Sequence, residues 1–510
     1  MRRKLARALW IFVAAALPLG ACGKSQDRSA KRTVHAESHE AAALAARAPV
    51  PMPDTMVAPN SEDYTSYGVN AMVDVANDPL STFSIDVDTA SYAIARRKIL
   101  EGALPPAASV RVEEFLNYFR YGYRAPTGDQ PFAVNMNAAP SPFTPNRHLL
   151  QIGVQGKRLA VHERKPVHLV FLADVSGSME SPDKLGLAKR ALRVLVNNLR
   201  DGDSVALVTY AGAVREVLAP TGLEHKAAIL SAIEDLQAGG STAMGSGLQL
   251  AYEMAARNLS SDSVSRVIVL SDGDANVGAT SHEEILATIE GKVKEGVTLS
   301  TVGFGMGNYK DTMMEQLADR GNGNYAYIDT IDEAKRVFQE QLDGTLEVIA
   351  KDVKIQVEFE PAAVKRYRLV GYENRDIADT DFRNDRVDAG EIGAGHTVTA
   401  LYEVELAGAM PADIGHLATV RIRHKAPRGT EAVEHAYSLS ASALARRFDD
   451  APADLRFATA VMAAAEKLRG SEYAANWSYA RIVEIARAAS TPEQAERHEF
   501  IALLERASAL

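Results

Sequence analysis

The chain predicts an α/β protein built around a doubly wound, mostly parallel sheet, and three observations lead to this prediction. Short apolar runs rich in β-branched residues recur between residues 167 and 329. Segments with helical periodicity separate these runs. A further run over 214–220, ended by Pro220, is typical of an antiparallel edge strand. Such alternation indicates a sheet with helices on both faces, in which ligands bind at the carboxyl ends of the strands.

The individual elements of this region follow from the same patterns. Continuous apolar runs predict buried strands over 167–174, 204–212, 265–272, 298–305 and 324–329. Amphipathic spacing predicts helices over 184–199, 224–236, 241–258, 281–296 and 309–321. We therefore expect one α/β domain over residues 161–345.

The flanking regions have different patterns. Residues 76–160 predict an N-terminal α+β region, with a strand through Phe83 and Ile85, helices from about Ser91 and over 109–119, and two further strands. Charged and apolar residues alternate in five segments of 346–440, as in an antiparallel β-sandwich with one solvated face. Residues 441–510 predict terminal helices.

The first residues have the features of a secretion signal. Arg2, Arg3, Lys4 and Arg7 precede an apolar stretch over 8–20 that is too short to span a bilayer. The sequence Leu19-Gly20-Ala21-Cys22 resembles the bacterial lipobox, and Cys22 is the only cysteine of the chain. The resemblance implies a signal peptide over 1–21 and a lipid anchor at Cys22. The alternative is an ordinary signal peptide beside a stray cysteine.

The lipobox resemblance also implies a location. Gly23 stands where an aspartate would retain a lipoprotein in the inner membrane, so we expect an outer-membrane anchor with the protein facing the periplasm or the cell surface. Residues 22–75 are rich in Ala, Ser, Pro and charged residues, which predicts a flexible tether. The formal net charge is −10, so the chain offers no overall basic character for nucleic acid.

Polar residues follow three strand ends of the α/β domain. Asp174 ends the first predicted strand, Ser176 and Ser178 lie in the loop behind it, Thr242 begins a helix after a glycine-rich loop, and Asp272 ends another strand. The carboxyl ends of parallel strands meet at one edge of a sheet. Two carboxylates and three hydroxyls there form an all-oxygen set that suits a hard divalent ion such as Mg²⁺. The alternative is that each residue caps a turn or a helix.

These five residues resemble the metal-ion-dependent adhesion site (MIDAS) of von Willebrand factor type A (VWA) domains, which reads Asp-x-Ser-x-Ser, then a distant Thr and a distant Asp. The resemblance implies that Ser176 and Ser178 bind Mg²⁺, or Mn²⁺ or Ca²⁺, directly. It implies that Asp174 and Asp272 act directly or through water, and that Thr242 joins in one state of the site. The last coordination position would belong to a carboxylate of an unknown partner protein.

The resemblance extends beyond the VWA region. The segments STFSIDVDTASY, KDVKIQVEFEPAAVKRYRLVGYENR and FRNDRVDAGEIGAGHTVTALYEVEL are similar to the flanks of a bacterial lipoprotein family of the YfbK type. We therefore expect a non-enzymatic, lipid-anchored envelope protein that captures a protein partner through its metal. A metal-assisted hydrolase using the same site and a structural envelope protein with an unused site stay open as alternatives.

Two further motifs have simpler explanations. Asp86-Val87-Asp88-Thr89-Ala90 approaches the Asp-x-Asp-x-Thr motif of haloacid-dehalogenase-type phosphatases, but its threonine comes one residue early, so we expect Asp88 or Thr89 to cap a helix. The segment from Asp272 to Glu283 approaches an EF-hand loop. Val277 stands where that loop requires glycine, so we reject a calcium loop here.

Overall fold

The computed structural model describes residues 62–85, 88–160, 163–241, 244–273, 282–305, 309–387, 389–408 and 415–510. The predictions for the signal peptide, for Cys22 and for Thr242 fall outside these ranges. The chain divides into two units, 1–57 and 58–510, and every element below belongs to the second. In the described part of the chain, no helix is long and apolar enough to cross a membrane.

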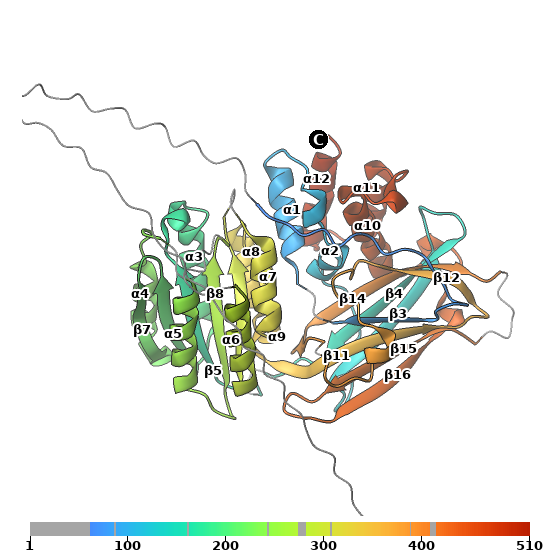
Figure 1. The fold of residues 1–510 in the computed structure, drawn as a ribbon. Helices are drawn as coiled ribbons and strands as arrows, with labels where there is room; N and C mark the ends of the chain where they lie inside the picture. Colours follow the sequence, from blue (N-terminus) through green and yellow to red (C-terminus); the bar gives the residue numbers. More distant parts are fainter. Residues whose placement is uncertain are drawn as a thin grey trace, which may run out of the picture. The chain divides into compact units, whose positions relative to one another are not determined.

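A six-stranded sheet forms the centre of the α/β domain and confirms the predicted fold class (Figure 1). Its strand order is β10-β9-β8-β5-β6-β7, and all neighbouring strands are parallel except β7, which runs antiparallel to β6 at the edge. The strands are β5 (Val167–Asp174), β6 (Ser204–Tyr210), β7 (Val214–Gly222), β8 (Val264–Ser271), β9 (Val297–Gly303) and β10 (Tyr325–Tyr327).

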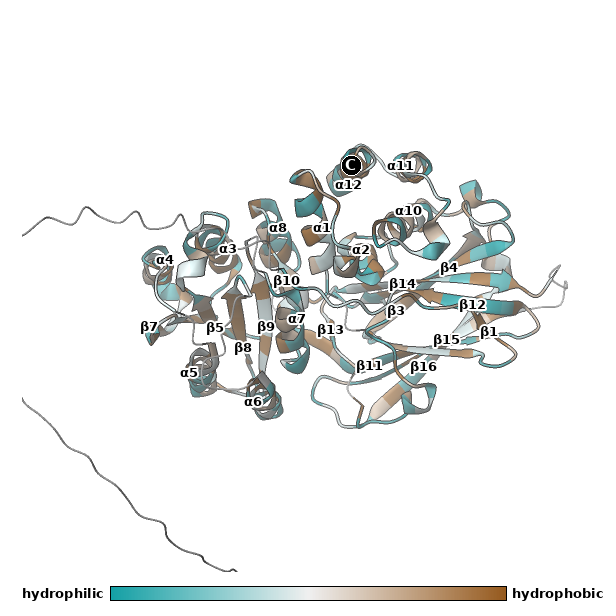
Figure 2. Ribbon diagram, turned by 45° about the horizontal axis from the view of Figure 1, so that its top comes forward, coloured by the Kyte–Doolittle hydropathy of each residue, from teal (hydrophilic) through white to brown (hydrophobic). Residues whose placement is uncertain are grey.

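Helices cover both faces of this sheet, which is why its strands are apolar on both sides (Figure 2). Leu169 and Phe171 of β5 pack on one side, and Val170 and Leu172 pack on the other. The first face is covered by α3 (Leu185–Asn198), α4 (Lys226–Glu234), α8 (Ile331–Lys335), the π-helical turn η4 (Arg336–Glu340) and α9 (Leu342–Leu346). The second is covered by α5 (Met244–Arg257), α6 (His282–Glu295) and α7 (Asp311–Arg320).

Two antiparallel sheets form the predicted β-sandwich. The first has the order β1-β12-β14-β4-β3, and the second has the order β13-β11-β15-β16, with β2 paired to β11. The strands are β1 (Val73–Asp74), β2 (Leu80–Ser84), β3 (Phe132–Pro140), β4 (Arg147–Gly156), β11 (Val348–Phe359), β12 (Val364–Val370), β13 (Ile392–Gly393), β14 (Thr397–Leu406), β15 (His416–Lys425) and β16 (Ala432–Ser440). One core joins their facing sides, including Ile152 and Val398 from the first sheet and Val357 and Ile422 from the second.

The strands of segment 76–160 are part of this sandwich, so the segment does not form a region of its own. Strand β4 pairs with β14 over nine positions, from Arg147–Glu405 to Gln155–Thr397, and β2 pairs with β11. We expected a flexible tether up to residue 75, but residues 63–74 already contact the folded protein. Asp63 pairs with Lys310, the Asn70 side chain donates to the carbonyls of Leu369 and Gly371, and β1 pairs with β12.

Helices from both ends of the chain cover the outer face of the first sheet. They are α1 (Ala90–Leu100), α2 (Val112–Tyr118), α10 (Ala453–Leu468), α11 (Tyr479–Ala488) and α12 (Ala495–Ala507). Their shared core includes Leu149 of β4 and Leu401 of β14, the neighbours of residues that face the sandwich interior. Because side chains alternate along a strand, the first sheet buries both of its faces.

Candidate functional site

The predicted metal residues lie at the carboxyl edge of the α/β sheet. Asp174 is the last residue of β5, and Asp272 directly follows β8. These two strands are hydrogen-bonded parallel neighbours, with Ala173 opposite Leu270, so their ends emerge side by side. Ser176 and Ser178 follow Asp174, and Ser178 lies in a single 3₁₀ turn over Gly177–Glu180. The structure therefore brings together four of the five predicted residues, and Thr242 lies outside the described ranges.

Hydrogen bonds hold this group in place. The Ser176 amide donates to Oδ1 of Asp174 at 2.9 Å, and the Ser271 hydroxyl donates to Oδ2 of Asp174 at 3.0 Å. The Ser176 and Ser178 hydroxyl oxygens lie 2.9 Å apart. Both oxygens of the Asp174 carboxylate are thus held in place, and both serine hydroxyls converge on one point beside it.

The site concentrates negative charge away from water. The side chains of Asp174 and Asp272 are fully buried, and Ser176 is nearly so. Burial raises the pKa of Asp174, and the charge of Asp272 raises it further, while the hydrogen bonds from Ser176 and Ser271 oppose the shift. Two carboxylates in one buried site require a compensating positive charge.

Sequence reasoning missed two residues that complete this arrangement. Lys184 Nζ lies 2.9 Å from Oδ2 of Asp272 and supplies one positive charge. Ser271 contacts Asp174 from the neighbouring strand and also accepts a hydrogen bond from the Gly273 amide at 3.0 Å. Ser271 could have been found as the hydroxyl beside Asp272. Nothing local marks Lys184, because only the folded chain places its ammonium at the strand end.

The donor set fits a hard divalent ion. It offers carboxylate and hydroxyl oxygens, which Mg²⁺ prefers. Within the ranges that the structure describes, no group of three or more His, Cys, Asp or Glu side chains is placed to hold a metal. A metal at this edge would therefore depend on Ser176 and Ser178 as much as on the aspartates.

The loops of the site are tied to the start of the described chain. The Phe304 amide donates to the Ser271 carbonyl at 3.0 Å, and the Arg97 guanidinium donates to the Gly305 carbonyl at 2.8 Å. Arg97 also forms an ion pair with Glu62 at 2.8 Å. Helix α1 therefore holds the loop after β9 beside the sheet edge that carries Asp174 and Asp272, which we call the metal edge after the predicted site.

The motif around Asp88 has a structural role that differs from the expected helix cap. Thr89 occupies the N-cap position of α1, but its side chain makes no capping hydrogen bond. Asp88 Oδ1 accepts from the Tyr325 amide at 2.7 Å, and Oδ2 lies 3.3 Å from Arg375 Nη2. Asp88 thus joins the α/β domain to the sandwich. Asp86 and Val87 lie outside the described ranges, as do residues 274–281 of the rejected EF-hand motif.

Family models match successive parts of the chain. The von Willebrand factor type A domain model matches residues 168–340, a model described as von Willebrand factor matches 58–151, and the model of the C-terminal region of the uncharacterized protein YfbK matches 344–510. The uncharacterized protein YfbK of Escherichia coli strain K12 is 40% identical over 472 residues, which are 88% of this chain and 81% of that protein. The chain belongs to the YfbK family.

Other similar proteins match smaller parts of this YfbK-family chain. The uncharacterized protein sll0103 of Synechocystis is 29% identical over 45% of this chain and 54% of its own length. Human inter-alpha-trypsin inhibitor heavy chain H3 is 28% identical over 38% of this chain and 22% of its own length. A solved structure, the von Willebrand factor type A protein from Catenulispora acidiphila, covers 76% of this chain and 91% of its own, with 18% identity and a TM-score of 0.43.

Proposed function

We propose that this VWA-domain protein is a non-enzymatic, lipid-anchored protein of the bacterial outer membrane that captures a partner protein through a divalent metal. Asp174, Ser176, Ser178, Thr242 and Asp272 would hold Mg²⁺, or Mn²⁺ or Ca²⁺, as a MIDAS. A carboxylate of the partner would complete the coordination of the ion. The single observation that carries the proposal is the convergence of the buried Asp174 carboxylate and the paired Ser176 and Ser178 hydroxyls at one strand end.

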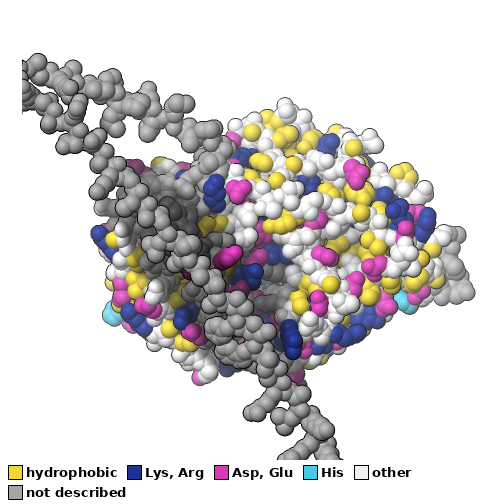
Figure 3. Space-filling view, viewed as in Figure 1, with side chains coloured by type: hydrophobic (Ala, Val, Ile, Leu, Met, Phe, Trp, Pro, Cys, Tyr) yellow, Lys and Arg dark blue, Asp and Glu magenta, His cyan; other side chains and the backbone are white. Residues whose placement is uncertain are grey.

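The face drawn in Figure 3 favours a protein partner over nucleic acid. On the face shown in Figure 3, Lys and Arg side chains are interspersed with Asp and Glu and form no broad patch of one sign among the described residues. A protein that tracks a phosphate backbone presents a basic stripe. The hydrolase alternative needs a general base beside the metal. The basic side chain that lies there, Lys184, is held in an ion pair with Asp272 at 2.9 Å.

Calorimetric titration of Mg²⁺, Mn²⁺ and Ca²⁺ into the purified protein tests the metal site. Asp174→Asn keeps the size of the side chain and an acceptor for the Ser176 amide but removes the charge. We expect saturable one-site binding to the wild type and at least a hundredfold weaker binding to the variant. Asp262→Asn makes the same chemical change in an exposed loop and should bind as the wild type does. Equal binding by all three proteins would contradict the proposal.

The anchor is tested separately in cells. Metabolic labelling with an alkyne-bearing fatty acid, followed by membrane fractionation, should label the wild type and place it in the outer membrane. Cys22→Ala removes the thiol that would carry the diacylglycerol, so we expect neither label nor membrane retention. Label that persists in Cys22→Ala would exclude this residue as the anchor while leaving the metal site unaffected.

A further inference from the structure

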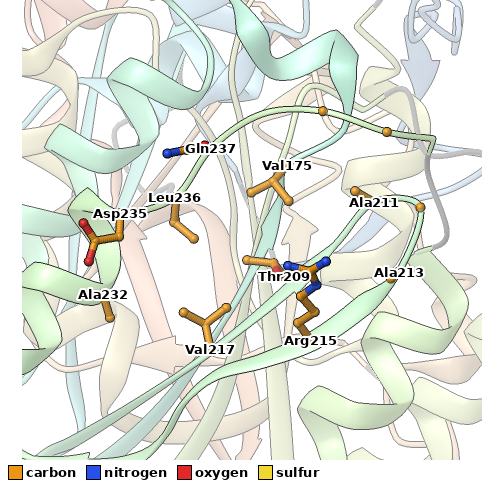
Figure 4. Close-up of a pocket in the computed structure, with 13 residues that line it drawn as sticks. Val175, Thr209, Ala211, Ala213, Arg215, Val217, Ala232, Asp235, Leu236 and Gln237 are labelled. Carbon is orange, nitrogen blue, oxygen red and sulfur yellow. The ribbon is translucent and has the colours of Figure 1, made fainter.

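A hollow of about 560 Å³ opens beside the metal edge (Figure 4). One wall is β7, which contributes Arg215 and Val217. The opposite wall is formed by Leu236, which follows α4, and by the chain that leads to Gly240. Val175 closes the end towards the loop that carries Ser176 and Ser178. A volume of this size accommodates several side chains of a bound segment.

Backbone hydrogen bonds join the wall of the hollow to the loop over residues 175–178, which carries Ser176 and Ser178. The Gly239 amide donates to the Val175 carbonyl at 2.8 Å, and the Gly177 amide donates to the Gly240 carbonyl at 3.0 Å. Val175 and Gly177 alternate with the metal residues Asp174, Ser176 and Ser178. A ligand that reaches the metal from this side therefore contacts the wall of the hollow.

The Arg215 side chain points into the hollow. Figure 4 shows its guanidinium directed towards Thr209 and Val175, while the Asp235 carboxylate lies on the other side of the hollow. Asp235 accepts a hydrogen bond from Ser231 at 3.4 Å. Across the described ranges, the Arg215 guanidinium forms no hydrogen bond or ion pair. The neighbouring basic residue Arg257, by contrast, pairs with Glu216 at 3.3 Å on the other side of β7.

The walls around Arg215 are largely apolar. Val217 follows it on the same face of β7 and is 39% exposed, and Leu236 is buried opposite. Arg215 itself is exposed, so a ligand in the hollow can reach it. A guanidinium binds a carboxylate through two parallel hydrogen bonds. The hollow therefore contains the Arg215 guanidinium, with which no described residue forms an ion pair, and its floor is apolar. It also adjoins the metal edge directly.

We infer that the partner presents a segment with two acidic side chains, one bound to the metal and the second bound to Arg215 in the adjacent hollow. This inference rests on the proposed metal bridge, because the first acid needs the ion. The two anchoring points would determine which carboxylate-bearing proteins are captured. Metal coordination alone would accept any exposed acid, whereas the pair requires two acids at a fixed separation.

Selection from random linear 12-residue peptides displayed on phage tests the inference. The immobilised full-length protein is panned in Mg²⁺, and bound phage are eluted with EDTA. Enriched peptides are synthesised with each acidic residue changed in turn to its amide, and their affinities are measured by fluorescence anisotropy. We expect two acids at a recurring spacing, and a loss of about tenfold or more when either is neutralised.

Variants separate the two contacts. Arg215→Gln should bind the parent peptide about tenfold more weakly and should no longer distinguish it from the peptide that lacks the second acid. Arg215→Lys should show an intermediate loss, because it keeps the charge but not the bidentate geometry. Arg257→Gln makes the same change in net charge on the other side of β7 and should bind as the wild type does.

The possible failures point to different conclusions. Peptides that bind equally in Mg²⁺ and EDTA, or no enrichment over the Asp174→Asn variant, would contradict the metal bridge itself. Metal-dependent peptides with a single required acid, or unchanged binding by Arg215→Gln, would overturn the two-acid inference alone. Equal losses in Arg215→Gln and Arg257→Gln would show a general charge effect and would also overturn it.

Discussion

The Lys184 ammonium lies 2.9 Å from Oδ2 of Asp272, a predicted metal ligand, and both side chains are buried. The aliphatic part of Lys184 packs against Gly305, where a Cβ atom would lie 2.2 Å from Lys184 Cγ. No larger residue fits at position 305 while the Lys184 side chain keeps this conformation. The protein thus places its own cation on one of the carboxylates that a metal would use.

Replacing Lys184 should affect metal binding and stability in opposite directions. Lys184→Met removes a positive charge beside the ion, so we expect Mg²⁺ affinity to rise by about tenfold. The same change leaves Asp272 buried without this counter-ion and should cost about 3–5 kcal/mol in the metal-free state. Calorimetry measures the affinity, and thermal unfolding in EDTA and in Mg²⁺ measures the stability. Weaker Mg²⁺ binding by Lys184→Met would contradict this account.

Two glycines of the α/β domain should respond oppositely to alanine. Gly273 follows Asp272 with φ +76°, and a Cβ atom there would lie 2.6 Å from the Lys310 amide nitrogen. Gly273→Ala therefore strains the backbone at the metal edge and should lower both the melting temperature and Mg²⁺ affinity. Gly291 lies in α6, where a Cβ atom would meet no other atom within 4 Å, so Gly291→Ala should stabilise the helix by about 0.5–1 kcal/mol. A destabilised Gly291→Ala would be inconsistent with this packing.

The buried Glu113 should make stability depend on pH. Burial, and next the charge of Glu373, raise the pKa of Glu113 from 4.5 to about 7. Between these values the folded protein holds a proton that the unfolded chain releases, so the free energy of unfolding should fall as pH rises from about 4.5 to 7. Glu113→Gln should flatten this slope because the amide does not titrate. Its oxygen can still accept the hydrogen bond from the Tyr372 amide.

Urea unfolding at several pH values between about 4.5 and 8 measures the effect of Glu113→Gln. The difference in stability between the variant and the wild type should grow in favour of the variant as pH rises. Glu253→Gln changes an exposed glutamate of α5 and serves as the control, with a slope equal to that of the wild type. Parallel curves for wild type and Glu113→Gln would show that Glu113 does not titrate in this window.

A buried ion cluster should be essential for joining α10 to the first sheet. Arg368 of β12 contacts Glu403 of β14 at 2.7 Å and Glu466 of α10 at 3.5 Å, and all three side chains are fully buried. Arg368→Met leaves the two buried carboxylates with one arginine each, Arg147 at 3.3 Å from Glu403 and Arg469 beside Glu466, and should cost about 3 kcal/mol. Arg366→Met, on the same strand, breaks only the partly exposed pair with Asp74 and should cost less than about 1 kcal/mol. Chemical denaturation compares the two variants, and equal losses would refute the distinction.

The sequence determined the elements of the α/β domain and the meeting of Asp174 and Asp272 at one edge of its sheet. Residues such as Leu169 and Val170 lie on opposite faces of β5, and a strand that is apolar on both faces belongs in the middle of a covered sheet. Asp174 and Asp272 were predictable as neighbours because parallel strands bring their carboxyl ends to one edge. Both inferences depend on periodicity and connection rules that act over short stretches of chain.

Only the tertiary structure decided which distant segments pair. The alternation of apolar and polar residues in β4 identifies a strand but not its partner β14, which lies far along the chain. The pairing of Asp63 with Lys310 joins two segments that are equally distant in sequence. Lys184 likewise meets Asp272 only in the folded protein. Pairing of this kind depends on complementary surfaces and on charge compensation in a dry interior, and local patterns encode neither.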